Sequence, residues 1–144
     1  MTEAELIRAV LIGGAIGGAV LSLIAFLLTR FGGDARGRTA LAIGLFAAAG
    51  AYFGFAIVGP AARVWVLIEL LQVVAFCLLG LYGLRGSANW LALGWVLHPV
   101  WDVGVHYFGP GRFAPVGYVF ACLSFDLVVA VYIFIAYRTN AQIK

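Results

Sequence analysis

Five apolar runs of about 20 residues follow one another along the chain, and short stretches rich in Gly, Pro and Arg separate them. The runs cover residues 6–28, 39–58, 64–84, 90–108 and 116–137. A transmembrane helix needs about 20 apolar residues, because each residue advances it by about 1.5 Å across about 30 Å of hydrocarbon. The pattern predicts an all-α fold, a polytopic transmembrane bundle of five helices that forms a single domain over residues 1–144.

The ends of the first run raise two further points. A cleavable signal peptide is the rival interpretation, but the flank carries Glu3 and Glu5 against Arg8, and the apolar stretch is longer than a usual signal core. We therefore expect the first helix to be retained.

The polar stretch that follows the first run, residues 30–38, is rich in Gly and charge and predicts a loop.

Composition supports the membrane assignment and excludes several other classes. Hydrophobic residues make up 65% of the 144 residues and charged residues 10%, whereas soluble domains carry about 25% charged residues. The net charge is +3, but the basic residues fall singly or in one short loop, which does not predict nucleic-acid binding.

The basic residues instead predict an orientation. Three of them lie near the N-terminus or in the second and fourth connections: Arg8, Arg63 and Arg112. Six lie on the opposite side: Arg30, Arg36, Arg38, Arg85, Arg138 and Lys144. Because cytoplasmic loops carry the excess of Lys and Arg, we expect the N-terminus outside and the C-terminus in the cytoplasm.

Small residues recur at helical spacing in the first two runs, as Gly13/Gly17, Gly14/Gly18 and Gly50/Gly54. Such residues let helix backbones approach closely in lipid. They predict packing within one bundle or, alternatively, a seam for a second copy or a membrane-complex partner. Neither run carries an acid or a histidine deep in its span, so we expect these helices to serve as scaffold.

Polar residues interrupt the last three runs: Glu69 and Gln72 in the third, His98, Asp102 and His106 in the fourth, and Cys122 and Asp126 in the fifth. An ionised Asp near the bilayer centre costs about 2.5–3.5 kcal/mol on insertion scales, so such residues normally face the bundle interior and pair. His98, Asp102 and His106 are spaced by four residues and project from one stripe of a helix.

Counting residues inward from the short fourth connection places His98 and Asp126 at the same depth on neighbouring antiparallel helices. We therefore expect them to be in contact, at the floor of a polar column that the last three helices enclose and that opens toward the outer face.

Pro99 removes a backbone donor and kinks its helix. The kink either opens a cavity beside His98 or merely shapes the bundle. Cys77 and Cys122 lie at different depths, so no disulfide between them is expected.

The polar column has three chemical interpretations. His98, Asp102, Asp126 and Glu69 could form a catalytic acid/base site. A divalent metal could be bound by His98, Asp102, His106 and Asp126, although no two histidines stand four residues apart as in known motifs. The third interpretation is a hydrogen-bonded polar core, or a binding or proton-relay site, without covalent chemistry.

Aromatic and polar neighbours predict a ligand-binding wall around this column. Trp95 and Trp101 flank His98 and either line a pocket for a lipid-like ring or serve packing within the bundle. The further candidates for ligand contact are Gln72, Cys122, Tyr118 and His106.

Two short patterns, H-P-x-W-D at residues 98–102 and C-x-x-x-D at residues 122–126, resemble small, functionally uncharacterised bacterial membrane families with five helices. The resemblance implies a multi-pass topology in the cell inner membrane. The chain departs from fatty-acid hydroxylases, whose di-iron chemistry uses several histidine boxes, because it has only two histidines.

The function that the sequence favours is binding of a small amphipathic or lipid-like ligand, with acid/base or metal-assisted conversion as an extension. The alternative is a non-catalytic subunit that packs into a larger membrane complex through Gly13, Gly17, Gly50 and Gly54. A third is a proton or ion pathway formed by an oligomer.

Overall fold

The computed structural model describes residues 2–141, with side chains as far as residue 137. Its elements are α1 (Glu3–Gly32), α2 (Asp34–Val58), α3 (Arg63–Arg85), α4 (Asn89–Trp101), the π-helix η1 (Asp102–Phe108) that continues α4, and α5 (Val116–Ala141). The described part of the chain is therefore all-helical, with five helices in the expected order. The Arg138 side chain and Lys144, two of the basic residues counted above, lie outside the described part.

Four helices, α1, α2, α3 and α5, are long and apolar enough to cross a membrane. Large apolar side chains such as Ile16, Phe31 and Leu71 are exposed on their outer faces, and only a surrounding apolar solvent makes so much exposed apolar surface stable. These features indicate a membrane protein. The remaining helix, α4, differs from these four, because it has only 13 residues before its backbone changes to the π-helix η1.

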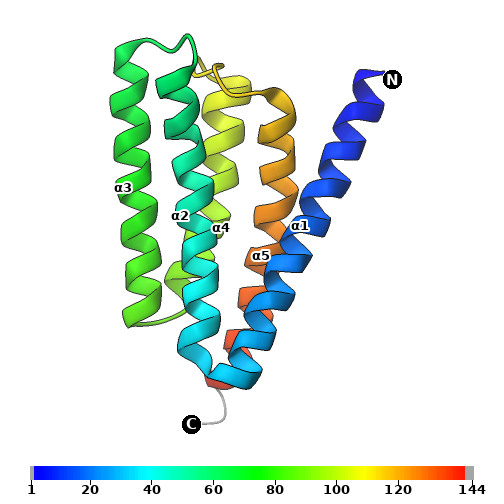
Figure 1. The fold of residues 1–144 in the computed structure, drawn as a ribbon, viewed down its shortest axis with the longest axis vertical. Helices are drawn as coiled ribbons and strands as arrows, with labels where there is room; N and C mark the ends of the chain where they lie inside the picture. Colours follow the sequence, from blue (N-terminus) through cyan, green and yellow to red (C-terminus); the bar gives the residue numbers. More distant parts are fainter. Residues whose placement is uncertain (1, 142–144) are drawn as a thin grey trace.

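The helices form a closed ring in which each packs against its neighbours in sequence, and α1 packs against α5 to complete it. Helix α2 also contacts α4 across the interior. In Figure 1, α1 begins at one end of the bundle and α5 finishes at the other, as an odd number of antiparallel passes requires. The apolar core, built around Trp95, Leu45 and Ile133, lies where α2, α4 and α5 meet.

The loop predicted for residues 30–38 is wrong. Helix α1 continues to Gly32 and α2 begins at Asp34, so Gly33 alone connects them. Gly33 has φ 88°, a conformation that favours glycine because it has no Cβ. The charged residues extend the helices because Asp34 lies in the first turn of α2 and Arg30 in the last turn of α1, where each complements the helix dipole.

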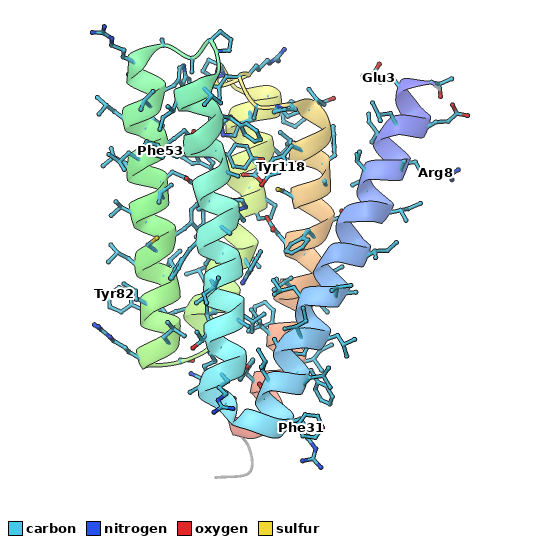
Figure 2. The ribbon with its side chains drawn as sticks, viewed as in Figure 1. Glu3, Arg8, Phe31, Phe53, Tyr82 and Tyr118 are labelled. Carbon is cyan, nitrogen blue, oxygen red and sulfur yellow. The ribbon has the colours of Figure 1, made fainter. Side chains whose placement is uncertain are left out.

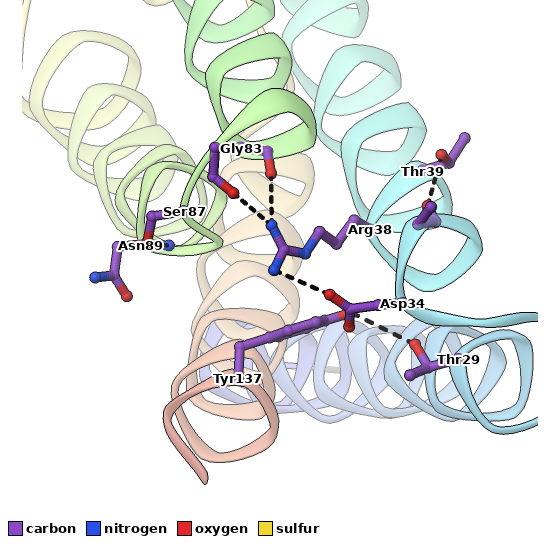
Figure 3. A network of polar contacts seen from close by, with 10 residues as sticks. Thr29, Asp34, Arg38, Thr39, Gly83, Ser87, Asn89 and Tyr137 are labelled. Carbon is purple, nitrogen blue, oxygen red and sulfur yellow. Dashed lines mark hydrogen bonds and ion pairs between the residues drawn. The ribbon is translucent and has the colours of Figure 1, made fainter. Parts of the chain in front are cut away.

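Arg38 joins this turn to the end of α3, as Figure 3 shows. Its guanidinium donates to the backbone carbonyls of Gly83 at 3.3 Å and Gly86 at 2.6 Å, and it pairs with Asp34 at 3.0 Å. It also lies 5.2 Å from the centre of the Tyr137 ring. One side chain thus satisfies carbonyls that the C-terminus of α3 leaves open and ties three helices together.

The glycines of α1 explain how closely this helix approaches α5. A Cβ on Gly14 would clash with the Ala121 carbonyl, and one on Gly18 would lie 2.5 Å from the Phe125 carbonyl oxygen. In contrast, a Cβ on Gly13 would meet no atom of the described residues within 4 Å. The pattern in α1 therefore serves packing within the bundle at Gly14 and Gly18.

This difference gives a matched test of the α1–α5 contact. We expect Gly18→Ala to destabilise the protein by about 1–3 kcal/mol, because the new methyl group meets fixed backbone rather than a movable side chain. Gly13→Ala should be neutral or stabilising by up to about 1 kcal/mol, since alanine is the better helix former. Thermal unfolding of both variants in detergent, followed by circular dichroism, measures the difference, and equal stability would contradict the close packing.

Candidate functional site

Three fully buried side chains meet where α4, η1 and α5 pack together. His98 Nδ1 lies 2.8 Å from Asp126 Oδ2 and 3.4 Å from Asp102 Oδ2. The contact between His98 and Asp126 that residue counting predicted is therefore present. We call these three residues the His–Asp cluster.

The backbone that presents the cluster consists of two parts where one helix was predicted over residues 90–108. Helix α4 continues through Pro99, and the Asp102 N–H is shared between the carbonyls of His98 and Pro99 before the chain continues as the π-helix η1. Because Pro99 supplies no N–H, the pattern of backbone hydrogen bonds along the helix is already irregular there. Helical turns of the π type are frequent at functional sites. His98 and Asp102 remain one turn apart and face the same neighbour.

His106 belongs to a second buried pair rather than to the His–Asp cluster. Its Nε2 lies 3.4 Å from Glu69 Oε1 on α3, and its Nδ1 donates to the Gly111 carbonyl at 2.6 Å. The carbonyl can only accept, which places a proton on Nδ1. Gln72 is buried one turn along α3 from Glu69.

Tyr52 is the buried site residue that the sequence reasoning missed. It is fully buried on α2, its ring stacks on the His106 ring with centres 4.4 Å apart, and it lies edge-on to His98 and Tyr118 at 5.7 and 5.5 Å. Helix α2, which we expected to serve as scaffold, thus also contributes a buried side chain beside the two histidines. A tyrosine inside an apolar run, directly after the small residues 47–51, was the available signal.

Many polar atoms in this region have no hydrogen-bond partner among the described residues. They include both carboxylate oxygens of Asp102, Oδ1 of Asp126, the Tyr52 hydroxyl and both amide atoms of Gln72. Native proteins leave few buried polar atoms unpaired, because each costs about 1–3 kcal/mol. Water, an ion or a polar ligand group is needed to complete the site.

A cavity of about 470 Å³ adjoins the cluster, lined by residues of α1, α2 and α5. Its wall is mostly small or aliphatic, with Gly17 and Ala48 among its members, and its polar groups are Tyr118, Cys122 and Asp126. Figure 2 shows Tyr118 on the inner side of the bundle. The expected enclosure by the last three helices is wrong for this cavity, because α1 and α2 form most of its wall.

The remaining candidates occupy different environments. Trp95 is fully buried in the apolar core, with its ring centre 5.8 Å from that of Phe125, and is not among the described residues that line the cavity. Trp101 packs against the same core with its indole nitrogen unpaired among the described residues. Cys77 and Cys122 are both free.

Comparison with known proteins places the chain in a family. The chain belongs to a family of unknown function, DUF6010, whose model matches residues 7–139. No curated protein and no solved structure matches it. Because the match spans almost the whole bundle, both the His–Asp cluster and the cavity lie within the region that defines the family.

The geometry of the cluster predicts strong coupling between His98 and Asp126. We expect His98→Ala and Asp126→Ala each to lower stability by about 3–5 kcal/mol for an ionic pair, since each leaves a buried partner unpaired. The double variant should cost less than the sum of the two. Thermal unfolding of the wild type, the two single variants and the double variant in detergent measures this coupling. Asp34→Ala, which removes a half-exposed carboxylate, should cost at most about 1 kcal/mol, and additivity of His98→Ala and Asp126→Ala would contradict the coupling.

Proposed function

We propose that the protein binds a small amphipathic, lipid-like ligand, with the ligand's apolar part in the cavity and its polar part beside the His–Asp cluster. The observation that carries the proposal is that Asp126 belongs to both places. It pairs with His98 at 2.8 Å and also lines the cavity. A ligand in the apolar cavity would therefore reach an acidic, hydrogen-bonding group without crossing a polar barrier.

The shape and chemistry of the cavity support a ligand of this class. Aliphatic residues of α1 such as Val20, Leu21 and Ile24 form one wall, and small residues of α2 form another. Such a wall favours alkyl or isoprenoid chains over polar solutes, because it offers dispersion and apolar burial but almost no hydrogen bonds. Tyr118, Cys122 and Asp126 supply the few polar contacts that would fix the orientation of a head group.

The proposal includes a location and an orientation. The protein is a multi-pass protein of the cell inner membrane, with its N-terminus outside and its C-terminus cytoplasmic. Support comes from the basic residues at one end of the bundle, where Arg36 and Arg38 follow the α1–α2 turn and Arg85 ends α3. The opposite end carries Arg63 and Arg112, together with the acidic residues Glu3 and Glu5 at the start of α1.

A second candidate function is that of a subunit in a membrane complex or homo-oligomer. The supporting observation is the open space around Gly13, Gly50 and Gly54, where an added Cβ would meet no atom of the described residues within 4 Å. Gly17 is less suited to this role, because Phe125 already lies against it. Small residues that face lipid allow a second helix to approach closely.

The ligand proposal is tested by filling the cavity. We expect Ala47→Phe to reduce the lipid that remains bound after detergent purification, because the new ring occupies space that an alkyl chain would fill. Organic extraction followed by mass spectrometry measures bound lipid per protein. A palmitate analogue that carries a diazirine group should label the wild-type protein within residues 14–24 or 118–126.

Ala19→Phe is the matched control. Ala19 is an exposed residue of α1 and is not among the residues that line the cavity, so this variant adds the same ring to an apolar outer surface. It should retain lipid and labelling at the wild-type level. Equal loss in both variants, or labelling spread evenly over the outer surface, would contradict binding in the cavity.

The orientation is tested by reporter fusions. Alkaline phosphatase, which is active only outside the cytoplasm, should be active when fused before Thr2 and inactive when fused after Lys144. Green fluorescent protein fused after Lys144 should fluoresce. Reversed results would overturn the orientation, and both termini on one side would overturn the five-pass arrangement.

A further inference from the structure

We propose that His98, Asp102 and Asp126 together bind one divalent transition-metal ion. This inference goes beyond the ligand binding proposed above and does not require it, because the three donors come from the bundle alone. Each residue offers a ligand atom, and these atoms lie within 4.8 Å of one another. All three side chains are fully buried.

The distances within the cluster fit a shared ion. His98 Nδ1 lies 2.8 Å from one carboxylate oxygen and 3.4 Å from the other. Donors held about 2.0–2.2 Å from a tetrahedral Zn²⁺ ion are separated from one another by about 3.3–3.6 Å. Both Nδ1–oxygen distances therefore lie within about 0.8 Å of the separation that ligands of one ion require.

The position of the His98 Nδ1 atom points to the same assignment. Nδ1 faces a carboxylate oxygen of both Asp102 and Asp126. A lone pair facing two carboxylates repels them unless a proton or a cation lies between. With an ion on Nδ1, the ring proton lies on Nε2, an atom that has no hydrogen-bond partner among the described residues.

Charge balance favours the ion over a bare cluster. Two carboxylates and a protonated imidazole leave a net charge of −1 inside an apolar bundle, where an unmatched charge is expensive. A divalent cation with two carboxylates and a neutral imidazole gives zero. The ion would also supply a partner for Asp102, whose carboxylate oxygens have no hydrogen-bond partner among the described residues.

The donor set restricts the metal. One imidazole nitrogen and two carboxylate oxygens suit Zn²⁺, Fe²⁺ or Mn²⁺, and they do not suit ions that require thiolate. Three protein ligands leave a fourth position open, as catalytic rather than structural zinc sites do. Tyr52 is a neighbour of Asp102, and the cavity reaches Asp126, so a phenol and the ligand-sized space both adjoin the residues that would hold the ion.

The test uses the full-length protein in detergent, stripped with a chelator and then titrated with Co²⁺ and with Zn²⁺. We expect one Co²⁺ per chain with visible absorption bands of a four- or five-coordinate ion, displacement of Co²⁺ by Zn²⁺, and a higher unfolding temperature with either metal. X-ray absorption of the Zn²⁺ form should show only nitrogen and oxygen ligands near 2.0–2.2 Å. A sulfur ligand near 2.3 Å would overturn the donor set, because it would identify Cys122 as a ligand.

The variant is Asp102→Asn, which keeps the shape of the side chain and removes its charge. It should weaken Co²⁺ binding by more than the roughly 10–100-fold that loss of an outer-shell partner costs. Asp34→Asn makes the same change in the Arg38 ion pair at the end of the bundle and should bind Co²⁺ as the wild type does. If Asp102→Asn does not fold, Asp126→Asn replaces it with the same expectation.

Three results would overturn the proposal: no metal-dependent spectrum or thermal shift in the wild-type protein, wild-type affinity in the folded cluster variants, or equal loss in Asp34→Asn. The lipid measurements on the Ala47→Phe variant are separate from these. Loss of bound lipid with intact Co²⁺ binding would leave the metal site standing, and the reverse result would leave the ligand cavity standing.

Discussion

A buried imidazole surrounded by carboxylates is the constraint on which the rest of the bundle depends. His98 is fully buried, and its ring is contacted from four helical segments: Asp126 on α5, Asp102 at the start of η1, Tyr52 on α2 and Phe76 on α3. In a low-dielectric interior a charge is stable only when its partners are held in place. The positions of these helices around α4 are therefore tied to the position of one ring.

The packing of α1 and the cavity have a common origin in residue size. Close approach of α1 to α5 requires the absence of side chains at Gly14 and Gly18, and the same helix contributes Gly14 and Gly17 to the wall of the cavity. Small residues allow backbone contact at some positions and leave free volume beside it. A bundle with larger side chains at these positions would push α1 outward and close off the path to Asp126.

Hydropathy and helical spacing predicted five helices and the meeting of His98 with Asp126, because the bilayer fixes the length of a helix and depth can be counted along it. They did not predict that Gly33 alone would join α1 to α2, because a stretch rich in charge and glycine is typical of a loop. The contact that stabilises the helical form of this stretch, from Arg38 to the carbonyls at the end of α3, joins residues far apart in the sequence. Tyr52 escaped notice because a phenol in an apolar run carries no charge. Its importance arises only from the stacking partner that a distant helix supplies. The cavity lined by α1, α2 and α5 likewise depends on the angle between α1 and α5. No local sequence pattern predicts this angle.

The division of the His–Asp cluster between two helices has a consequence for the biogenesis of the protein. During synthesis, α4 and η1 enter the membrane machinery with His98, Asp102 and His106 but without Asp126, which is translated about one helix later. A segment with an unpaired acid and a helix-kinking proline is a poor substrate for release into lipid on its own. Helix α5, in contrast, is long and apolar enough to cross a membrane by length and composition. We therefore expect α4 and η1 to be integrated into the membrane together with α5, because α5 carries their counter-group.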